Sequence, residues 1–103
     1  MSRPERNVHI AKSVKVIEWL KTELLDQIAN LYKGLHQANQ SLISDSLASL
    51  VIVVYVLARR VGISYREVDQ TVSRKLREHT RERHQLEDWY GDLSQLEEYI
   101  SKR

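Results

Sequence analysis

The sequence predicts an all-α protein, and three observations support this. Apolar residues recur every three or four positions through most of the chain, which is the period of an amphipathic helix. The 103 residues include one proline and three glycines, so few residues interrupt long helices. The length suits one domain, and we expect residues 1–103 to form a single α-helical domain.

Composition narrows the class of protein. The chain is 42% hydrophobic and 29% charged, as soluble globular proteins are. Its net charge of +2 is too balanced to predict a partner that is a polyanion. There are no cysteines, which excludes a disulfide scaffold and thiolate metal sites. The N-terminal stretch MSRPERNVHI has no apolar signal-peptide core, so we expect a cytoplasmic protein.

The first helix is expected from about Val8 to Lys33. Asn7 can cap its start, and Gly34 suits the left-handed residue just past a helix end. The apolar residues that define this helix are Ile10, Val14, Ile17, Leu20, Leu24, Ile28, Leu31 and Leu35.

A second helix is expected from about Ser41 to Val61, after the linker GLHQANQ. It contains nine consecutive apolar residues, LVIVVYVLA, of which five are β-branched. We interpret this run as helix because it continues the three-and-four spacing set by Ile43 and Leu47. Gly62 then ends the helix.

The nine-residue run raises the question of what covers it. It is short of the roughly 20 residues that span a bilayer, and Asp45 lies close upstream, so we expect no membrane span. A helix that is apolar nearly all round must be buried nearly all round. Three other helices can hardly surround it, so we expect a second copy of the chain, in a homodimer or a tetramer.

Two further helices follow. Ser64 and Glu67 match the capping box at the start of a third helix, which carries Val68, Val72 and Leu76. Asp92 can cap a short fourth helix with Leu93, Leu96 and Ile100 on one face. Between these helices, Trp89 and Tyr90 are expected to cover the end of the bundle.

The first two helices should pack antiparallel because the linker between them is short. Glu23 and Asp26 share one face of the first helix, and Ser46 and Ser49 share one face of the second. Counted from the linker, the two pairs should come level, so that two carboxylates lie opposite two hydroxyls.

At this point a resemblance becomes specific. The segment from Glu18 to Ser64 resembles the MazG-like branch of the all-α nucleotide pyrophosphohydrolase superfamily, in its first helix, the Lys-Gly after it, and the second helix ending in LARRVGIS. The resemblance implies a helical bundle with a central antiparallel hairpin, completed by dimerisation. Active members cleave nucleoside triphosphates to monophosphate and pyrophosphate with Mg²⁺, which an EExxE and an ExxD motif hold.

In this chain those motifs are degenerate. By the resemblance, the first falls on Thr22, Glu23 and Asp26, and the second on Ser46 and Ser49. Glu23 and Asp26 are thus the residual metal ligands, and the other three positions have lost their carboxylate. Mg²⁺ prefers charged oxygen ligands, and a serine hydroxyl supplies neither charge nor a base.

We therefore predict a MazG-like protein with an eroded Mg²⁺ site, non-catalytic, whose groove binds a nucleotide or a protein partner. One alternative is an active Mg²⁺-dependent pyrophosphohydrolase that uses Glu23 and Asp26, assisted by Asp45. Another is a helical adaptor or nucleic-acid-binding dimer. In purely structural terms, the two acids are surface charges and the two serines are small packing residues.

The basic tract RKLREHTRERH, residues 74–84, bears on the last alternative. Two glutamates interrupt it and it contains no aromatic residue to stack on a base, so we expect a solvated helix surface and not a nucleic-acid site. By the resemblance, Lys75 and Arg81 lie roughly where family members place basic side chains near phosphates.

Overall fold

The chain folds into α-helices throughout the part that the structure describes. The computed structural model describes residues 3–81 and 91–102, with side chains for residues 10–78 and 91–102. Its helices are α1 (Arg3–Gln37), α2 (Gln40–Arg60), α3 (Tyr65–Arg81) and α5 (Asp92–Ser101), and the described residues include no strand. This confirms the all-α prediction. The helices form two compact units, Met1–Ile63 and Ser64–Arg103, which are described separately.

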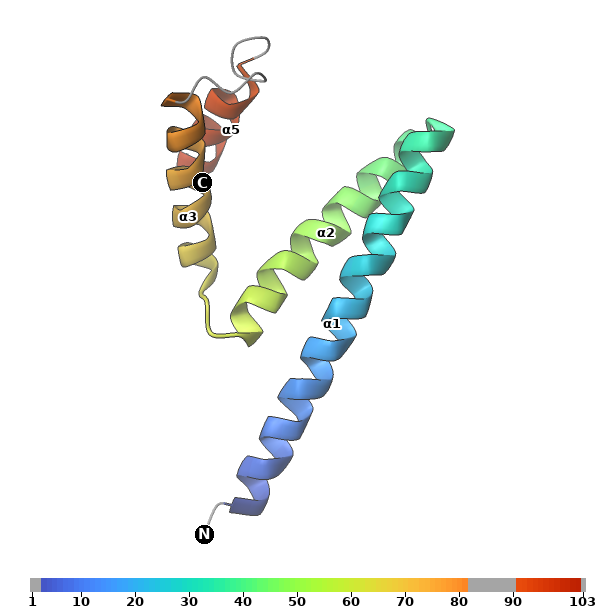
Figure 1. Ribbon diagram of the computed structural model, residues 1–103, viewed down its shortest axis with the longest axis vertical. Coiled ribbons are helices and arrows are strands. Elements are labelled where there is room, and N and C mark those ends of the chain that lie inside the picture. Colours follow the sequence, from blue (N-terminus) through green and yellow to red (C-terminus); the bar gives the residue numbers. More distant parts are fainter. Residues whose placement is uncertain (1–2, 82–90, 103) are drawn as a thin grey trace. The chain divides into compact units, whose positions relative to one another are not determined.

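In the first unit, α1 and α2 form the predicted antiparallel hairpin (Figure 1). The connection is only Ala38 and Asn39, because α1 continues four residues past the expected end at Lys33. Gly34 therefore lies inside the helix, and our assignment of it to the left-handed position was wrong. Ala38 takes that role at φ 52°, with its N–H bonded to Leu35 O and the Asn39 N–H bonded to Gly34 O.

The ends of α2 follow recognisable capping patterns. Asn39 is its N-cap, and the side-chain oxygen accepts a 3.1 Å hydrogen bond from the Leu42 N–H. At the other end Gly62 is left-handed at φ 93°, and the Ile63 N–H returns to Ala58 O at 2.8 Å, which confirms the predicted stop. The start of α1 differs from the prediction, because Asn7 lies within the helix and not at its cap.

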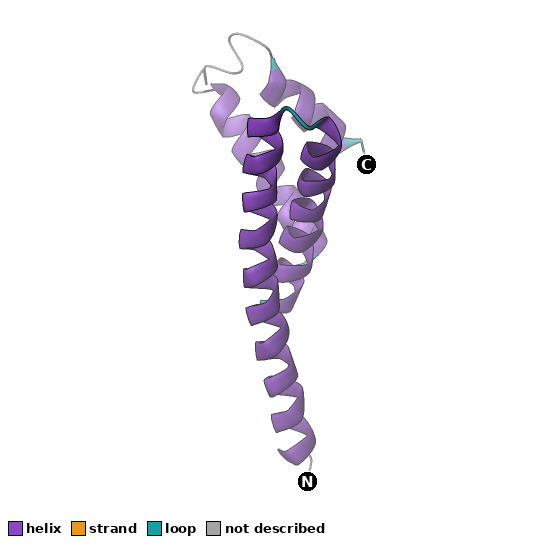
Figure 2. Cartoon of the chain, turned by 90° about the vertical axis from the view of Figure 1, so that its right-hand side faces the viewer, coloured by secondary structure: helices purple, strands orange, loops and turns teal. Residues whose placement is uncertain are grey.

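The contact between α1 and α2, which we call the hairpin seam, is formed by small and apolar residues and by one glutamine. On α1 it includes Leu20, Gln27 and Gly34, spaced seven residues apart, and on α2 it includes Ser46 and Val53, also seven apart. Leu20, Ser46 and Val53 are 2%, 0% and 5% exposed, and Gly34 is buried. A seven-residue repeat keeps one stripe of each helix in contact along a nearly antiparallel pair. Figure 2 shows the two helices side by side, with the first part of α1 extending beyond α2.

Most of the apolar surface of α2 is exposed in the single chain. Among the described residues, α2 is the one helix long and apolar enough to cross a membrane by length and composition, and only 11% of its apolar window is buried. The nine-residue run on which we based our expectation of no span is thus part of a 21-residue helix. The core helix of a soluble protein can be equally long and apolar, but most of its apolar residues are buried inside the protein. The apolar window of α2 is not covered in this way.

In the second unit, α3 packs against α5 around Leu76, which is buried. The cap of α3 confirms half of the predicted box: the Glu67 N–H donates to Ser64 Oγ at 3.1 Å, and that hydroxyl donates to Glu67 Oε1 at 3.3 Å. The fourth predicted helix, α5, starts one residue earlier than expected, with left-handed Gly91 and not Asp92 as N-cap, and with Asp92 in its first turn. The prediction for Trp89 and Tyr90 lies outside the described residues.

Candidate functional site

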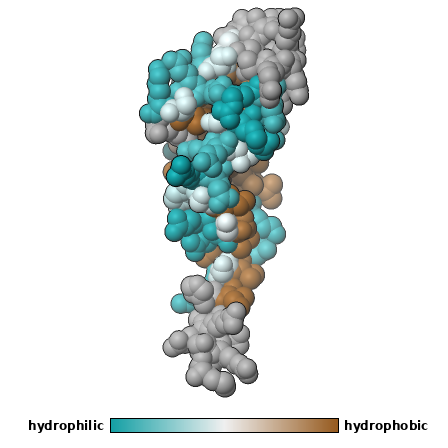
Figure 3. All heavy atoms as spheres, turned by 90° about the vertical axis from the view of Figure 1, so that its left-hand side faces the viewer, coloured by the Kyte–Doolittle hydropathy of each residue, from teal (hydrophilic) through white to brown (hydrophobic). Residues whose placement is uncertain are grey.

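The seam separates two faces of the hairpin. In an antiparallel pair of right-handed helices, the residues just after a seam position lie on one common face, and those just before it lie on the other. The first face, which we call the apolar face, contains Ile28 and Leu35 from α1 and Leu47 and Val54 from α2. All four are exposed. Figure 3 shows hydrophobic side chains at the surface of the molecule.

The candidate metal ligands lie on the opposite side, which we call the acidic face. Asp26 and Asp45 each precede a seam residue and are exposed, while Glu23 and Ser49 lie closer to the seam and are half-buried. The structure thus brings three of the five motif positions to one face. Thr22 is exposed one step further round α1. Ser46 is not on this face, because it lies in the seam itself.

The register between the helices decides which residues come level. A Cβ built on Gly34 would be 3.1 Å from the backbone N of Ile43, so these two positions are opposite one another. Counting 1.5 Å per residue from there, Asp26 and Ser49 are level to within about 3 Å. Glu23 and Ser46 are about 12 Å apart along the axis, so the predicted pairing of the two motifs holds only for Asp26 and Ser49.

The hydroxyls at two degenerate positions are turned back onto their own helices. Ser46 Oγ donates to Leu42 O at 2.7 Å, and the side chain is 0% exposed. Thr22 Oγ1 donates to Glu18 O at 3.2 Å. Both are i−4 bonds of the kind that serine and threonine make inside helices. Neither oxygen is therefore directed at a ligand shared between α1 and α2.

The retained acid, Glu23, already has a hydrogen-bond donor. Gln27 Nε2 donates to Glu23 Oε1 at 2.9 Å, one turn along the same helix. The other amide atom, Gln27 Oε1, is buried and has no hydrogen-bond partner among the described residues. A buried acceptor without a donor costs about 1–3 kcal/mol. Sequence reasoning missed Gln27, although its seven-residue spacing from Leu20 and Gly34 places an amide in the seam.

These residues do not fit a resident Mg²⁺. Mg²⁺ needs near-octahedral oxygen ligands and is normally bound through carboxylates that converge on it. Within the described residues there is no group of three His, Cys, Asp or Glu side chains that could hold a metal ion. Asp45, considered as an assisting acid, lies on the acidic face but about 9 Å along the axis from Asp26 by the register.

The basic residues of the tract at residues 74–84 are in the second unit. Lys75 is exposed on α3, and the side chain of Arg81 lies outside the described residues. Two arginines of the tract pair with acids, Arg74 with Glu78 at 3.2 Å and Arg77 with Glu97 at 3.4 Å. This pairing is typical of the solvated helix surface that the sequence predicts.

The chain is an all-α protein built on an antiparallel helical hairpin, with acidic residues on one face of the hairpin. The model of the MazG-like family matches residues 10–93, which spans the hairpin, α3 and the start of α5. The chain therefore belongs to the MazG-like family, as the resemblance predicted. No curated protein and no solved structure shows a significant match.

Proposed function

We propose that this chain is a MazG-like protein that binds a partner and does not hydrolyse nucleotides. The observation that carries the proposal is Ser46, which replaces a metal-binding carboxylate, is 0% exposed and is hydrogen-bonded to its own helix. A ligand position that is sealed in the seam cannot accept a metal. Catalysis by the family's route needs the metal to neutralise phosphate charge and position the substrate.

The charges on the acidic face also indicate which class of ligand it binds. Without a metal, the three carboxylates of Glu23, Asp26 and Asp45 outnumber the ammonium group of Lys33, which precedes the seam residue Gly34 on the same face, and their net negative charge repels nucleotide phosphates. A protein segment with basic side chains is complementary to that face. Of the two ligand classes that the sequence suggested, a nucleotide and a protein partner, the acidic face fits a basic protein segment better.

Turnover assays test the lack of catalysis. We expect pyrophosphate release from a panel of nucleoside triphosphates, with Mg²⁺ or Mn²⁺, to equal that of a blank. Glu23→Ala is the matched variant, and it should leave the signal unchanged. Metal-dependent release above the blank that Glu23→Ala abolishes would show instead that the chain is an active pyrophosphohydrolase.

We also propose that a second copy of the chain covers the apolar face. The face includes Ile28, Leu35, Leu47 and Val54, with Tyr32 and Val51 at its edges. Two helices of roughly 30 Å, lying side by side, present on the order of 600 Å² on one face, near the 800 Å² per partner of standard interfaces. Two hairpins related by a two-fold axis then make a four-helix bundle.

The alternative cover for α2 is a lipid bilayer, and the first half of this helix argues against it. Ser41, Ser44, Asp45, Ser46 and Ser49 fall within its first ten residues. A spanning helix needs about 20 predominantly apolar residues. The polar half of α2 instead suits a soluble bundle whose acidic face is in water.

Oligomeric state in solution tests this proposal. We expect the chain to sediment as a dimer, or as a tetramer built from two dimers, and Val54→Glu to shift it towards the monomer. Ile52→Glu is the control, because Ile52 is 62% exposed on the acidic side of α2 and should not affect assembly. A monomer at micromolar concentration contradicts the proposal, and flotation of the intact chain with liposomes would assign the apolar face to a membrane.

A further inference from the structure

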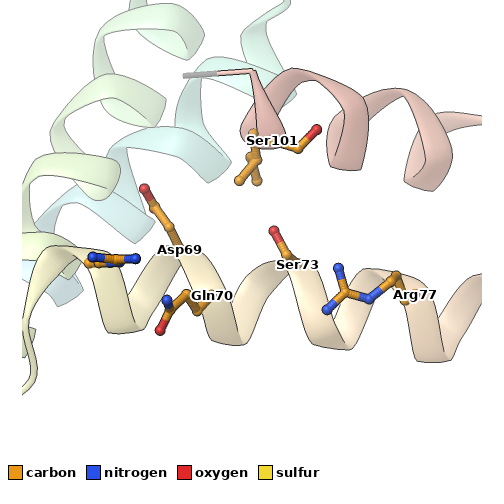
Figure 4. Close-up of a pocket in the computed structure, with 7 residues that line it drawn as sticks. Asp69, Gln70, Ser73, Arg77 and Ser101 are labelled. Atoms are coloured by element: carbon orange, nitrogen blue, oxygen red, sulfur yellow. The ribbon is translucent and has the colours of Figure 1, made fainter.

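The second unit contains a polar cavity that the proposed function does not use. It has a volume of about 400 Å³ and lies between one face of α3 and the C-terminal end of α5 (Figure 4). Its α3 wall is formed by Arg66, Asp69, Gln70, Ser73 and Arg77. A volume of this size is within the range of small-molecule sites.

The lining favours a polar ligand. Ile100 is the one apolar residue among those that line the cavity. Ser73 and Asp69 extend from α3 towards Ser101 on α5, and the guanidinium of Arg77 reaches back along α3 towards Ser73. Arginine and hydroxyl donors from one helix face are therefore directed at the same space.

Arg77 is the strongest anion-binding group in this arrangement. Its Nη1 lies 3.4 Å from Glu97 Oε1, a long contact between α3 and α5. A guanidinium has five N–H donors, so this one bond leaves most of them available. The side chain is 60% exposed and can be reached by a ligand. Arginine binds phosphate with paired, charge-assisted hydrogen bonds.

The hydrogen-bond acceptors of the cavity restrict the charge of the ligand. Ser101 Oγ donates to Glu98 O at 3.1 Å, so towards the cavity this oxygen is an acceptor. Asp69 adds a carboxylate. One anionic group of a ligand can bind Arg77 and Ser73, and a hydroxyl group of the same ligand can donate to Ser101. Asp69, which already has an interaction partner, limits the negative charge that the cavity accepts. A bare polyphosphate would be repelled by Asp69.

We propose that this cavity binds a small phosphate monoester that carries hydroxyl groups. The site differs from the position of Lys75, which the family resemblance associates with phosphates. On a helix, Lys75 is turned about 200° from both Ser73 and Arg77, so it lies on the opposite face of α3. The proposal is independent of the hairpin and of its acidic face.

Titration by ¹H–¹⁵N NMR of the full chain tests the proposal, with glycerol 3-phosphate, inorganic phosphate, pyrophosphate and glycerol as probes at constant ionic strength. We expect saturable shifts in α3 and α5 that are tightest for glycerol 3-phosphate. Arg77→Gln should weaken that binding about tenfold or more, the usual effect of losing a charge-assisted hydrogen bond. Lys75→Gln is the matched control and should leave it unchanged.

Glu97→Gln gives a second, opposite readout. It removes the acid that competes for Arg77, so we expect tighter binding of glycerol 3-phosphate, which a merely structural role of the ion pair would not produce. The proposal is overturned if no probe gives saturable shifts, if Lys75→Gln weakens binding as much as Arg77→Gln does, or if Glu97→Gln weakens it. Shifts confined to α1 and α2 would also overturn it and would assign the ligand to the hairpin.

Discussion

Gly34 and Ile43 are in direct contact across the turn of the helical hairpin. A Cβ placed on Gly34 would be 3.1 Å from both the backbone N and the Cγ1 of Ile43, and 3.3 Å from Leu42 Cγ. The backbone atom cannot move away unless α2 moves with it. This close approach sets the register of the hairpin, and through it the positions of Asp26 and Ser49 on the acidic face.

We therefore expect Gly34→Ala to destabilise the protein. Alanine is favoured over glycine inside a helix by about 1 kcal/mol, whereas overpacking costs about 1–3 kcal/mol. The net expected loss is about 1 kcal/mol in the free energy of unfolding, measured by urea denaturation. Ala29→Gly, at an exposed position of α1, measures the propensity contribution alone. A more stable Gly34→Ala variant would mean that the two helices do not approach this closely.

The role of Gly34 marks the limit of what the sequence predicts. The three-and-four spacing of apolar residues located each helix, and the stop at Gly62 was correct. The sequence alone does not distinguish a glycine that ends a helix from a glycine inside a helix that lets a second helix pack closely. The difference lies in the partner helix, because the contact with Ile43 explains a glycine at a position that lies inside α1.

For the candidate site, the sequence predicted which helices carry the motif residues but not which face each residue occupies. Motif spacing predicted that the pairs Glu23/Asp26 and Ser46/Ser49 come level, and in the structure Glu23 and Ser49 are half-buried beside the seam. Helical periodicity alone could not show that Ser46 lies in the seam and Asp45 on the acidic face, since one residue of rotation separates a buried position from an exposed one. The cavity beside Arg77 involves α5, which is close to α3 only in the folded chain.

The cap of α2 gives a second prediction. Asn39 accepts a hydrogen bond from the Leu42 N–H, directly beside the Gly34 contact. We expect Asn39→Ala to cost about 1 kcal/mol of unfolding free energy, and Asn39→Asp to retain most of it. Thermal and urea unfolding measure both. If Asn39→Ala has no effect, the turn is held by the seam and not by the cap.

A third prediction concerns the unpaired Gln27 Oε1. Gln27→Leu removes a buried acceptor without a donor and places an apolar side chain in the seam between Leu20 and Gly34. It also removes the bond to Glu23, which is partly solvated. We expect a gain in unfolding free energy of about 1 kcal/mol. The control is Gln37→Leu, at an exposed position near the end of α1. A clear loss of stability in Gln27→Leu would indicate that the assembled protein supplies a donor to this oxygen.

The last prediction is that carboxylates can be introduced at two of the three predicted motif positions that carry a hydroxyl group, but not at the third. Thr22 is exposed and Ser49 is half-buried, and both border the face that carries Glu23 and Asp26. Thr22→Glu with Ser49→Asp should therefore fold, and we expect this double variant to bind Mg²⁺ at least about tenfold more tightly than the parent, by isothermal titration calorimetry.

Ser46→Glu should behave differently, because its side chain is 0% exposed and faces α1 in the seam. An unpaired charge buried there costs several kcal/mol, so we expect unfolding of the hairpin or separation of α1 from α2, visible in circular dichroism and urea denaturation. Ser46→Ala is the control, and it should cost about 1 kcal/mol or less, because the lost hydroxyl bond is intrahelical. If Ser46→Glu folds normally and improves Mg²⁺ binding, position 46 faces the metal site, and the proposal that the seam seals this position is contradicted.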